Sequence, residues 1–313
     1  MSTAYELMES LRTEGASRFE QTSLAQDHSP LTRRVRRQRT VRTAGASVVG
    51  VAAAGAVMFA GSQFLDKDTA VPPANPTTAA PAPTASGNAE AELRGTLYVA
   101  RGERAEYVAR DLAAIFDVSA EEAEAALKAA LPEEAAATVE GWVAPGEYPA
   151  RADASVEDVA AQVVGAQIAR LEATGVPRSE WESTIILASM LDKEVPNPSD
   201  MSLVSRVIHN RLEQGMLLQL ESPLAYYLRA DERTVGDDGW AVDTPYNLFM
   251  YEGLPPTAIG AASAEAIDAA ADPEAGSWLF FLVKPDGNCL VFATFEDYAA
   301  AVDEYFPGTG ASD

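Results

Sequence analysis

An uncharged, apolar run over residues 43–65 constrains this chain more than any other feature. It reads TAGASVVGVAAAGAVMFAGSQFL. As a helix it would be about 35 Å long, enough to cross a bilayer core of roughly 30 Å. The arginine-rich stretch RRVRRQRTVR precedes it at residues 33–42, and the positive-inside rule keeps that side in the cytoplasm. The sequence predicts a single-pass protein of the cell membrane, with a cytoplasmic basic segment (1–42) and all later residues extracytoplasmic.

A cleaved signal peptide is the alternative interpretation of this run. Against it stand the 42 residues that come before the run and the run's own length. A small-x-small cleavage site and a nearby lipid-carrying cysteine are also lacking. We therefore expect a transmembrane helix that is retained.

Charge is unevenly distributed along the 313 residues, whose net charge is −24. Residues 1–42 hold 8 Arg against 5 Asp or Glu, whereas the rest holds 15 basic against 42 acidic residues. A surface of that sign repels nucleic acid. We expect no nucleic-acid partner.

Cysteine and histidine are too scarce for cross-links or metal clusters. Cys289 is the single cysteine, so no intrachain disulfide can form. His28 and His209 lie far apart in the sequence, without cysteines at metal-ligand spacing. The sequence predicts no metal site and no cofactor.

Composition and pattern divide the chain after the predicted transmembrane helix into four segments. A stretch rich in Pro, Ala and Thr is typical of an extended linker. A short strand, a turn at Gly102 and two helices, the second capped by Ser119, then predict a small βαα module. The predicted linker, module, main domain and tail are residues 66–92, 93–139, 140–306 and 307–313.

Three helices are predicted in the first half of the main domain. The first follows a turn-rich entry at 140–154 and runs from Ser155 to Gly175. The third spans residues 200–214 and is capped by Ser199.

The second helix carries the most informative sequence. It is expected to begin near Glu180, because Ser179 and Glu182 have the S-x-x-E spacing of a capping box. Pro196 and Pro198 stop it.

Loops and strands are predicted after Gly215. Residues 277–294, SWLFFLVKPDGNCLVFAT, contain two apolar runs around Pro-Asp-Gly-Asn, which predicts a hairpin. A last helix is expected at 295–306. The predicted fold class is α+β.

Glu194 lies at the end of the second helix, on its apolar stripe. Residues three, four and seven positions earlier share its helical face, and these are Leu191, Met190 and Leu187. Asp192 points to the opposite side. Burial among leucines and the negative end of the helix dipole would both raise the pKa of the Glu194 carboxyl, as a general acid near neutral pH requires. From position alone, a solvated residue or one paired with a neighbouring cation is the alternative.

Four sequence segments follow one another along the chain, the first of them ending at Glu194. They are ILASMLDKE, VSRVIHNRLEQGMLLQLESPLAYYL, TPYNLFMYEGLPPTAI and the hairpin with TFEDY. In content and order they resemble the YceG-like family, the endolytic murein transglycosylases. The resemblance covers residues 140–306. It implies a YceG-like catalytic domain, with Glu194 as the catalytic residue of the family's A-S-x-x-x-x-E block. The module at 93–139 resembles, more weakly, the LysM-like module that precedes such domains.

The sequence departs from the family pattern near the expected substrate subsites. The Asp, small residue and Thr that follow Leu-Gln in the family are replaced at residues 220–223, and Asn-Pro-Gly is replaced at 261–263. Tyr298 stands where a His is frequent, and Gly146 and Glu147 replace the usual entry residues. The catalytic acid is retained, while the outer subsites differ.

The resemblance implies a route that needs one carboxyl. Glu194 would protonate the glycosidic oxygen between N-acetylmuramic acid and N-acetylglucosamine, then accept the proton of the muramic C6 hydroxyl. That hydroxyl would attack C1 and leave a 1,6-anhydro end. The expected substrate-binding residues are polar or aromatic. Gln219, Tyr246 and Asn247 are expected in loops after helices, Tyr226 or Tyr246 would supply a flat apolar face, and Glu221 would either stabilise developing charge or be a solvated loop residue.

The sequence thus predicts a membrane-anchored lytic transglycosylase that cuts nascent peptidoglycan strands and limits their length, with cell-wall synthases as candidate partners. Two alternatives stay open. One is a weakly active or inactive glycan-binding scaffold, given the altered motifs. The other is a hydrolase with two carboxylates, using Asp200 or Glu221 as the second.

Overall fold

The structure, a computed structural model, describes residues 92–135, 138–230 and 239–307. The predicted cytoplasmic segment and the transmembrane helix lie outside these residues. Among the helices in the described ranges, none combines the length and the apolar character that crossing a membrane requires.

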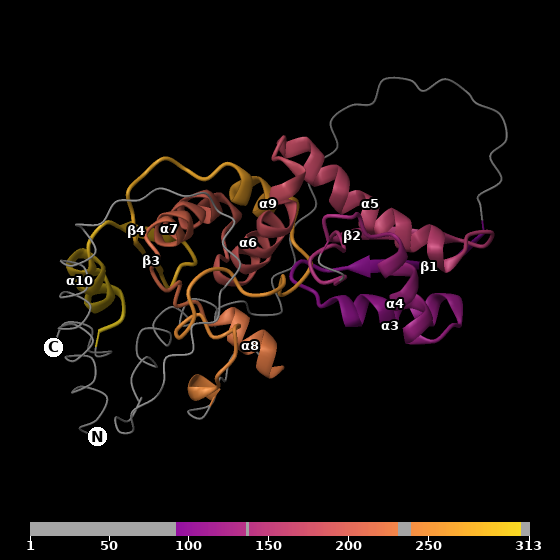
Figure 1. Cartoon of the computed structure of the whole chain (residues 1–313), viewed down its shortest axis with the longest axis horizontal. Helices are drawn as coiled ribbons and strands as arrows, with labels where there is room; N and C mark the ends of the chain where they lie inside the picture. Colours follow the sequence, from indigo (N-terminus) through magenta and orange to yellow (C-terminus); the bar gives the residue numbers. More distant parts are fainter. Residues whose placement is uncertain (1–91, 136–137, 231–238, 308–313) are drawn as a thin grey trace.

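A βααβ unit forms one end of the described chain (Figure 1). Its elements are β1 (Leu93–Val99), α3 (Ala105–Phe116), α4 (Ala120–Ala129) and β2 (Gly146–Arg151). The two strands pair antiparallel. The turn-rich entry predicted at 140–154 was therefore wrong in part, because it contains β2. Glycine at its start and proline within it weaken the strand signal, and pairing with β1 overrides them.

Helix caps in this half follow the sequence signals. Ser119 forms a capping box with Glu122 at the start of α4. α5 (Val156–Thr174) begins with a second capping box at Ser155. It ends at Gly175, whose left-handed backbone is one that glycine adopts without strain. Both starts and the stop are confirmed.

Three helices build the main core next to this unit: α6 (Trp181–Glu194), α7 (Met201–Glu213) and α9 (Ala264–Ala271). α6 packs on both α7 and α9, and ten of its fourteen residues are buried. A helix buried on most sides has little amphipathic pattern, so burial rather than propensity stabilises α6. The regions of α8 (Ser222–Leu228) and α9 were predicted as loops and strands, and that was wrong because both are helices. Ser263 caps α9, which is rich in alanine.

Two predicted caps were also wrong. A 3-10 turn at Arg178–Glu180 leads into α6, and no side chain caps its first turn. Glu182 instead accepts a hydrogen bond from the indole N–H of Trp142, at 3.1 Å. Before α7, Asn197 caps a 3-10 turn by accepting from the backbone N–H of Ser199. In both places a short 3-10 turn takes the place of the predicted cap. The predicted helix starts are confirmed within one residue, since α6 begins at Trp181 and α7 at Met201.

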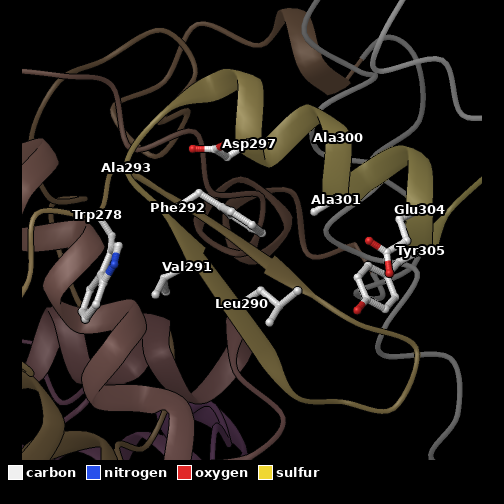
Figure 2. A pocket seen from close by; sticks show the side chains of 10 residues that line it. All are labelled: Trp278, Leu290, Val291, Phe292, Ala293, Asp297, Ala300, Ala301, Glu304 and Tyr305. Carbon is white, nitrogen blue, oxygen red and sulfur yellow. The ribbon is translucent and has the colours of Figure 1, made fainter.

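The C-terminal hairpin and helix occupy the other end of the described chain (Figure 1). β3 (Phe280–Val283) and β4 (Cys289–Phe292) pair antiparallel, and α10 (Phe295–Tyr305) packs on them. Hairpin and helix are confirmed. An open groove of about 510 Å³ runs between β4 and α10, with Trp278 at one end and Tyr305 at the other (Figure 2). The candidate site residues do not line it.

The described chain is thus a mixed α/β fold, in line with the predicted α+β class. One buried core joins β1, α3, α4 and α5, and a second surrounds α6, α7 and α9. Because α5 and the β1–β2 ladder contribute to the first core, residues on both sides of the predicted boundary at 139/140 pack together.

Candidate active site

Glu194 is the last residue of α6, and the structure places it as the helical periodicity predicts. Leu187, Met190 and Leu191 of the same face are buried, and Glu194 itself is half-buried. Asp192 faces elsewhere, into a buried network with Ser263. The carboxyl of Glu194 therefore lies at the rim of the main core, at the end of a rigid helix.

Ser222, at a position where the sequence departs from the family pattern, holds this carboxyl. Ser222 donates to Glu194 Oε1 through its hydroxyl, at 2.6 Å, and through its backbone N–H, at 3.2 Å. It is the first residue of α8 (Ser222–Leu228). Hydrogen bonds from two donors stabilise the negative charge of a carboxylate. The sequence could not predict these hydrogen bonds, because they depend on how α8 packs on α6.

Glu221 brings a second carboxyl to the same place. It is the N-terminal flanking residue of α8 and half-buried. Burial first, and then the negative charge of Glu194, raise the pKa of Glu221 from 4.5 to about 7. At neutral pH the site therefore holds one carboxyl that is close to its titration midpoint.

Gln219 lies just before this pair, in a backbone conformation that is uncommon for residues other than glycine. Its φ is 54°. The backbone N–H donates to the Leu248 carbonyl at 3.0 Å. The side-chain oxygen lies 3.5 Å from an amino group of the buried Arg211, which also donates to the carbonyls of Leu218 and Leu279. Arg211, for which the sequence predicts no role in the site, thus fixes the loop that leads to Glu221.

Tyr226 is held by the N-terminal unit. Its hydroxyl donates to Glu140 Oε2 at 2.9 Å, and the guanidinium of Arg104 lies 4.4 Å from its ring centroid. Burial, then the charge of Glu140, raise the pKa of Tyr226. One face of this ring is therefore covered by the protein's own arginine.

Tyr246 lies between two tyrosines of α8. Its ring centroid is 5.8 Å from that of Tyr226 and 5.5 Å from that of Tyr227, and its hydroxyl is 2.7 Å from that of Thr257. Tyr227 is 49% exposed. Tyr227 is thus the most exposed of the three rings, and no sequence pattern indicated it.

Asn247 is placed differently from the prediction that it binds sugar. It is 0% exposed. Its amide donates to the carbonyls of Trp240 and Val242, and its oxygen accepts from the backbone N–H of Phe249. In this placement the Asn247 side chain shapes the loop that carries Tyr246.

The remaining acidic candidate lies outside this cluster. Asp200 Oδ2 accepts from the backbone N–H of Cys289 at 2.7 Å, which ties the start of α7 to the hairpin. Among the residues that the structure describes, no group of three or more His, Cys, Asp or Glu side chains could hold a metal ion. The structure thus brings together Glu194, Glu221 and Ser222, with the tyrosines farther along α8.

Comparison with known proteins gives consistent matches. The family model of the YceG-like family matches residues 80–304. A curated protein of Bacillus subtilis (strain 168), the endolytic murein transglycosylase, is 26% identical over 175 residues, which cover 53% of this chain and 48% of that protein. The protein of the same name from Streptococcus pneumoniae serotype 2 (strain D39 / NCTC 7466) is 24% identical over 186 residues and is covered to 32%. The chain thus spans about half the length, or less, of these relatives.

A solved structure matches the fold. A crystal structure at 2.6 Å described as that of a yceG-like protein from Listeria monocytogenes has a TM-score of 0.57, with 21% sequence identity. The match covers 66% of this chain and 76% of that one. At this identity the likeness concerns the fold alone.

Proposed function

The chain belongs to the YceG-like family, and we propose that it is a murein transglycosylase in which Glu194 is the catalytic residue. The observation that carries the proposal is the position of the Glu194 carboxyl, at the end of a buried helix and hydrogen-bonded to Ser222. The printed name of the curated relatives supports the same activity. A half-buried carboxyl at a rigid helix end suits proton transfer to a positioned sugar.

In the proposed reaction one carboxyl acts twice. Protonated Glu194 gives its proton to the oxygen that links N-acetylmuramic acid to N-acetylglucosamine, and the bond from C1 to that oxygen breaks. The oxygen of the muramic C6 hydroxyl then bonds to C1 and returns its proton to the Glu194 carboxylate. The products are a free N-acetylglucosamine end and a 1,6-anhydromuramic end, and no water is consumed.

Ser222 and Glu221 would each assist this reaction, Ser222 through Glu194 and Glu221 through its charge. The two donors of Ser222 stabilise Glu194 while it is ionised and ready to take the C6 proton. Glu221 is close enough for its negative charge to act on Glu194. When ionised, it would also favour positive charge developing at C1.

The sugar-binding role stays a proposal for Gln219 and for the tyrosine cluster. We place the flat apolar surface for a sugar ring on Tyr227, because Arg104 covers Tyr226 and Tyr246 lies between the two. Aromatic faces of this kind suit the apolar side of a pyranose.

Membrane attachment rests on the sequence alone. We propose the span at 43–65 as an anchor and the linker at 66–92 as a tether, which would keep the site close to the outer face of the membrane, where new glycan strands emerge. Endolytic cutting of those strands, a resulting limit on their length and contact with cell-wall synthases belong to the same proposal. The βααβ order of the N-terminal unit supports its interpretation as the LysM-like module.

A hydrolase is the second candidate, favoured by one observation. Burial first, and then the charge of Glu194, raise the pKa of Glu221, so a second carboxyl lies within electrostatic range of Glu194. Hydrolytic glycosidases use two carboxyls. Asp200 is less suited to this role, since it binds the hairpin backbone. Hydrolysis would give reducing muramic ends in place of anhydro ends.

Product analysis distinguishes these functions. The purified full chain, its Glu194→Gln variant and a control, Glu213→Gln at the exposed end of α7, are incubated with un-cross-linked glycan strands, and the products are analysed by mass spectrometry. We expect anhydro-ended fragments from the parent and the control, and none from Glu194→Gln. Reducing ends would indicate the hydrolase, and intact strands with all three proteins would favour a glycan-binding scaffold.

A further inference from the structure

Two arginines in the turn between β1 and α3 reach the two helices that meet at Glu194. Arg101 and Arg104 are three residues apart and belong to the N-terminal unit. Arg101 contacts the C-terminal end of α6, and Arg104 contacts the C-terminal part of α8. α6 ends and α8 begins at the candidate site. The last carbonyls of a helix such as α6 have no partner within the helix itself.

Arg101 makes three contacts with the last turn of α6. Its Nε lies 2.6 Å from Asp192 Oδ1, and one amino group donates to the carbonyls of Asp192, at 3.0 Å, and Val195, at 2.7 Å. The Asp192 side chain is 0% exposed and also accepts two hydrogen bonds from Ser263, the cap of α9. Glu194 lies between the two carbonyls in sequence, so the guanidinium fixes the backbone on both sides of it.

Arg104 holds α8 in a similar way. Its amino group donates to the Tyr226 carbonyl at 2.9 Å, and its guanidinium stacks on the Tyr226 ring. The Tyr226 hydroxyl is bound by Glu140, whose other oxygen accepts from the backbone N–H of Ala105, the residue after Arg104. The position of α8, and with it that of Ser222, thus depends on the same turn.

The turn itself is fixed on the main domain by its backbone. Gly102 donates to the Ala261 carbonyl at 2.8 Å, and Ala261 donates to the Glu103 carbonyl at 2.8 Å. Gly102 has a φ of +70°, and a side chain there would come within 3.0 Å of Lys193. Two backbone hydrogen bonds flanked by two arginine contacts leave the turn little freedom to move relative to α6.

We propose that Arg101 and Arg104 are positioning residues, which set the distance between Glu194 on α6 and Ser222 and Glu221 on α8. The N-terminal unit is then part of the catalytic machinery and not only a separate glycan-binding module. The proposal rests on the proposed function for its effect on catalysis, whereas the effect on helix order stands without it. A displacement of about 1 Å at a catalytic group is enough to slow a reaction about a hundredfold.

The test compares Arg101→Ala, Arg104→Ala, the corresponding Lys variants and a control, Arg110→Ala, in the full chain. Arg110 lies on α3 of the same unit and makes an exposed pair with its neighbour Asp111. For each protein, kcat and KM are measured on glycan strands. Amide hydrogen exchange is followed at residues 191–195 and 222–228, and thermal unfolding checks that the variant is folded at the assay temperature.

We expect both Ala variants to lose about tenfold or more in kcat, with KM changed by less than about threefold. Exchange should accelerate at 191–195 in Arg101→Ala and at 222–228 in Arg104→Ala, and the control should match the parent. Lysine has one point-like head group, so Arg104→Lys should recover most of the rate, whereas Arg101→Lys should not replace three contacts at once.

Two results would overturn the inference: a folded Arg101→Ala or Arg104→Ala variant with parental kcat, or a change confined to KM. If Arg101→Ala does not fold, Arg101→Lys decides by the same criteria. If Arg104→Ala does not fold, Arg104→Met, which keeps an apolar stem and removes the hydrogen-bond donor, takes its place. If the parent yields no anhydro products, the proposed function has failed, and exchange alone decides whether the two arginines hold the helices: parental exchange in the Ala variants overturns the inference.

Discussion

The Glu194 carboxyl and the Ser222 hydroxyl are joined by a hydrogen bond of 2.6 Å. The bond links the last residue of α6 to the first residue of α8. A second bond, from the Ser222 backbone N–H, runs in the same direction. Both a side-chain donor and a backbone donor of Ser222 therefore orient the carboxyl. Mutation can remove the side-chain donor but not the backbone donor.

Ser222→Ala tests this division. A hydrogen bond to a charged group contributes about 1.5 kcal/mol or more, so we expect kcat on glycan strands to fall about tenfold. Activity should not vanish, because the backbone donor remains. Ser222→Thr keeps the hydroxyl and should retain most of the rate. Equal losses in both variants would show that the hydroxyl is not what orients Glu194.

The pH dependence of stability should reveal the buried charge of Glu221. Its pKa is about 7 in the folded chain against 4.5 as an ordinary carboxyl, so the folded state binds the proton more tightly than the unfolded state. Stability therefore falls as the pH rises from about 4.5 to 7, and the full cost of the charge is present above that window. Below it the carboxyl is protonated in both states and costs nothing.

Glu221→Gln removes this cost. We expect the free energy of unfolding to rise by about 1–3 kcal/mol at pH 8, with no gain at pH 4. Urea unfolding at the two pH values measures the difference. A gain of equal size at both would mean that packing, and not charge, is responsible.

Asp192→Asn should destabilise the chain through the network that Arg101 forms. Burial raises the pKa of Asp192, while Ser263 and Arg101 act against that shift. Removing one partner from a buried pair leaves groups without their counterparts, and since Arg101 is partly exposed we expect a loss of about 2–4 kcal/mol in urea unfolding. Asp111→Asn, which breaks an exposed pair, should cost less than about 0.5 kcal/mol. Similar losses for the two would refute the buried network as the cause.

Tyr227→Ala tests the proposed sugar platform. Loss of an aromatic contact worth about 0.5–1.5 kcal/mol should raise KM on glycan strands roughly threefold to tenfold and leave kcat nearly unchanged. Tyr227→Phe keeps the ring and should behave as the parent. Phe295→Ala removes an exposed ring on α10, at the other end of the chain, and should have no effect. If Tyr227→Ala also leaves KM unchanged, the sugar ring is bound elsewhere.

Sequence signals that act on neighbouring residues predicted the helix ends correctly. Contacts between residues far apart in the sequence could not be predicted. α5 begins after Ser155 and ends at Gly175 as predicted, because each of these residues acts on its own end of the helix. Ser179 does not cap α6 because it lies within the 3-10 turn Arg178–Glu180. Glu182, its expected partner, accepts a hydrogen bond from Trp142, forty residues away in sequence. α8 and α9 are short, and their helical pattern is too brief to distinguish from a loop.

The same division applies to the candidate site. Periodicity alone placed Glu194 on a buried face, and helix geometry turned Asp192 away from it. The roles of Ser222, Arg101 and Arg104 depend on contacts between elements far apart in sequence, so no local pattern could indicate them. Nothing local predicted the burial of Asn247 either, because its partners lie within a loop whose path is set by the core.

Substitution of Gly141 tests how closely the two cores pack where they meet. Its φ is +85°, and a methyl group there would lie 2.4 Å from both Ile185 of α6 and Ala258. Gly141→Ala therefore combines backbone strain with overpacking next to the helix that carries Glu194, and we expect a loss of about 3 kcal/mol or more in urea unfolding. Gly165→Ala, in the exposed middle of α5 with open space around it, should instead gain about 0.5–1 kcal/mol. If Gly141→Ala unfolds at the parental urea concentration, Ile185 and Ala258 do not pack closely around Gly141.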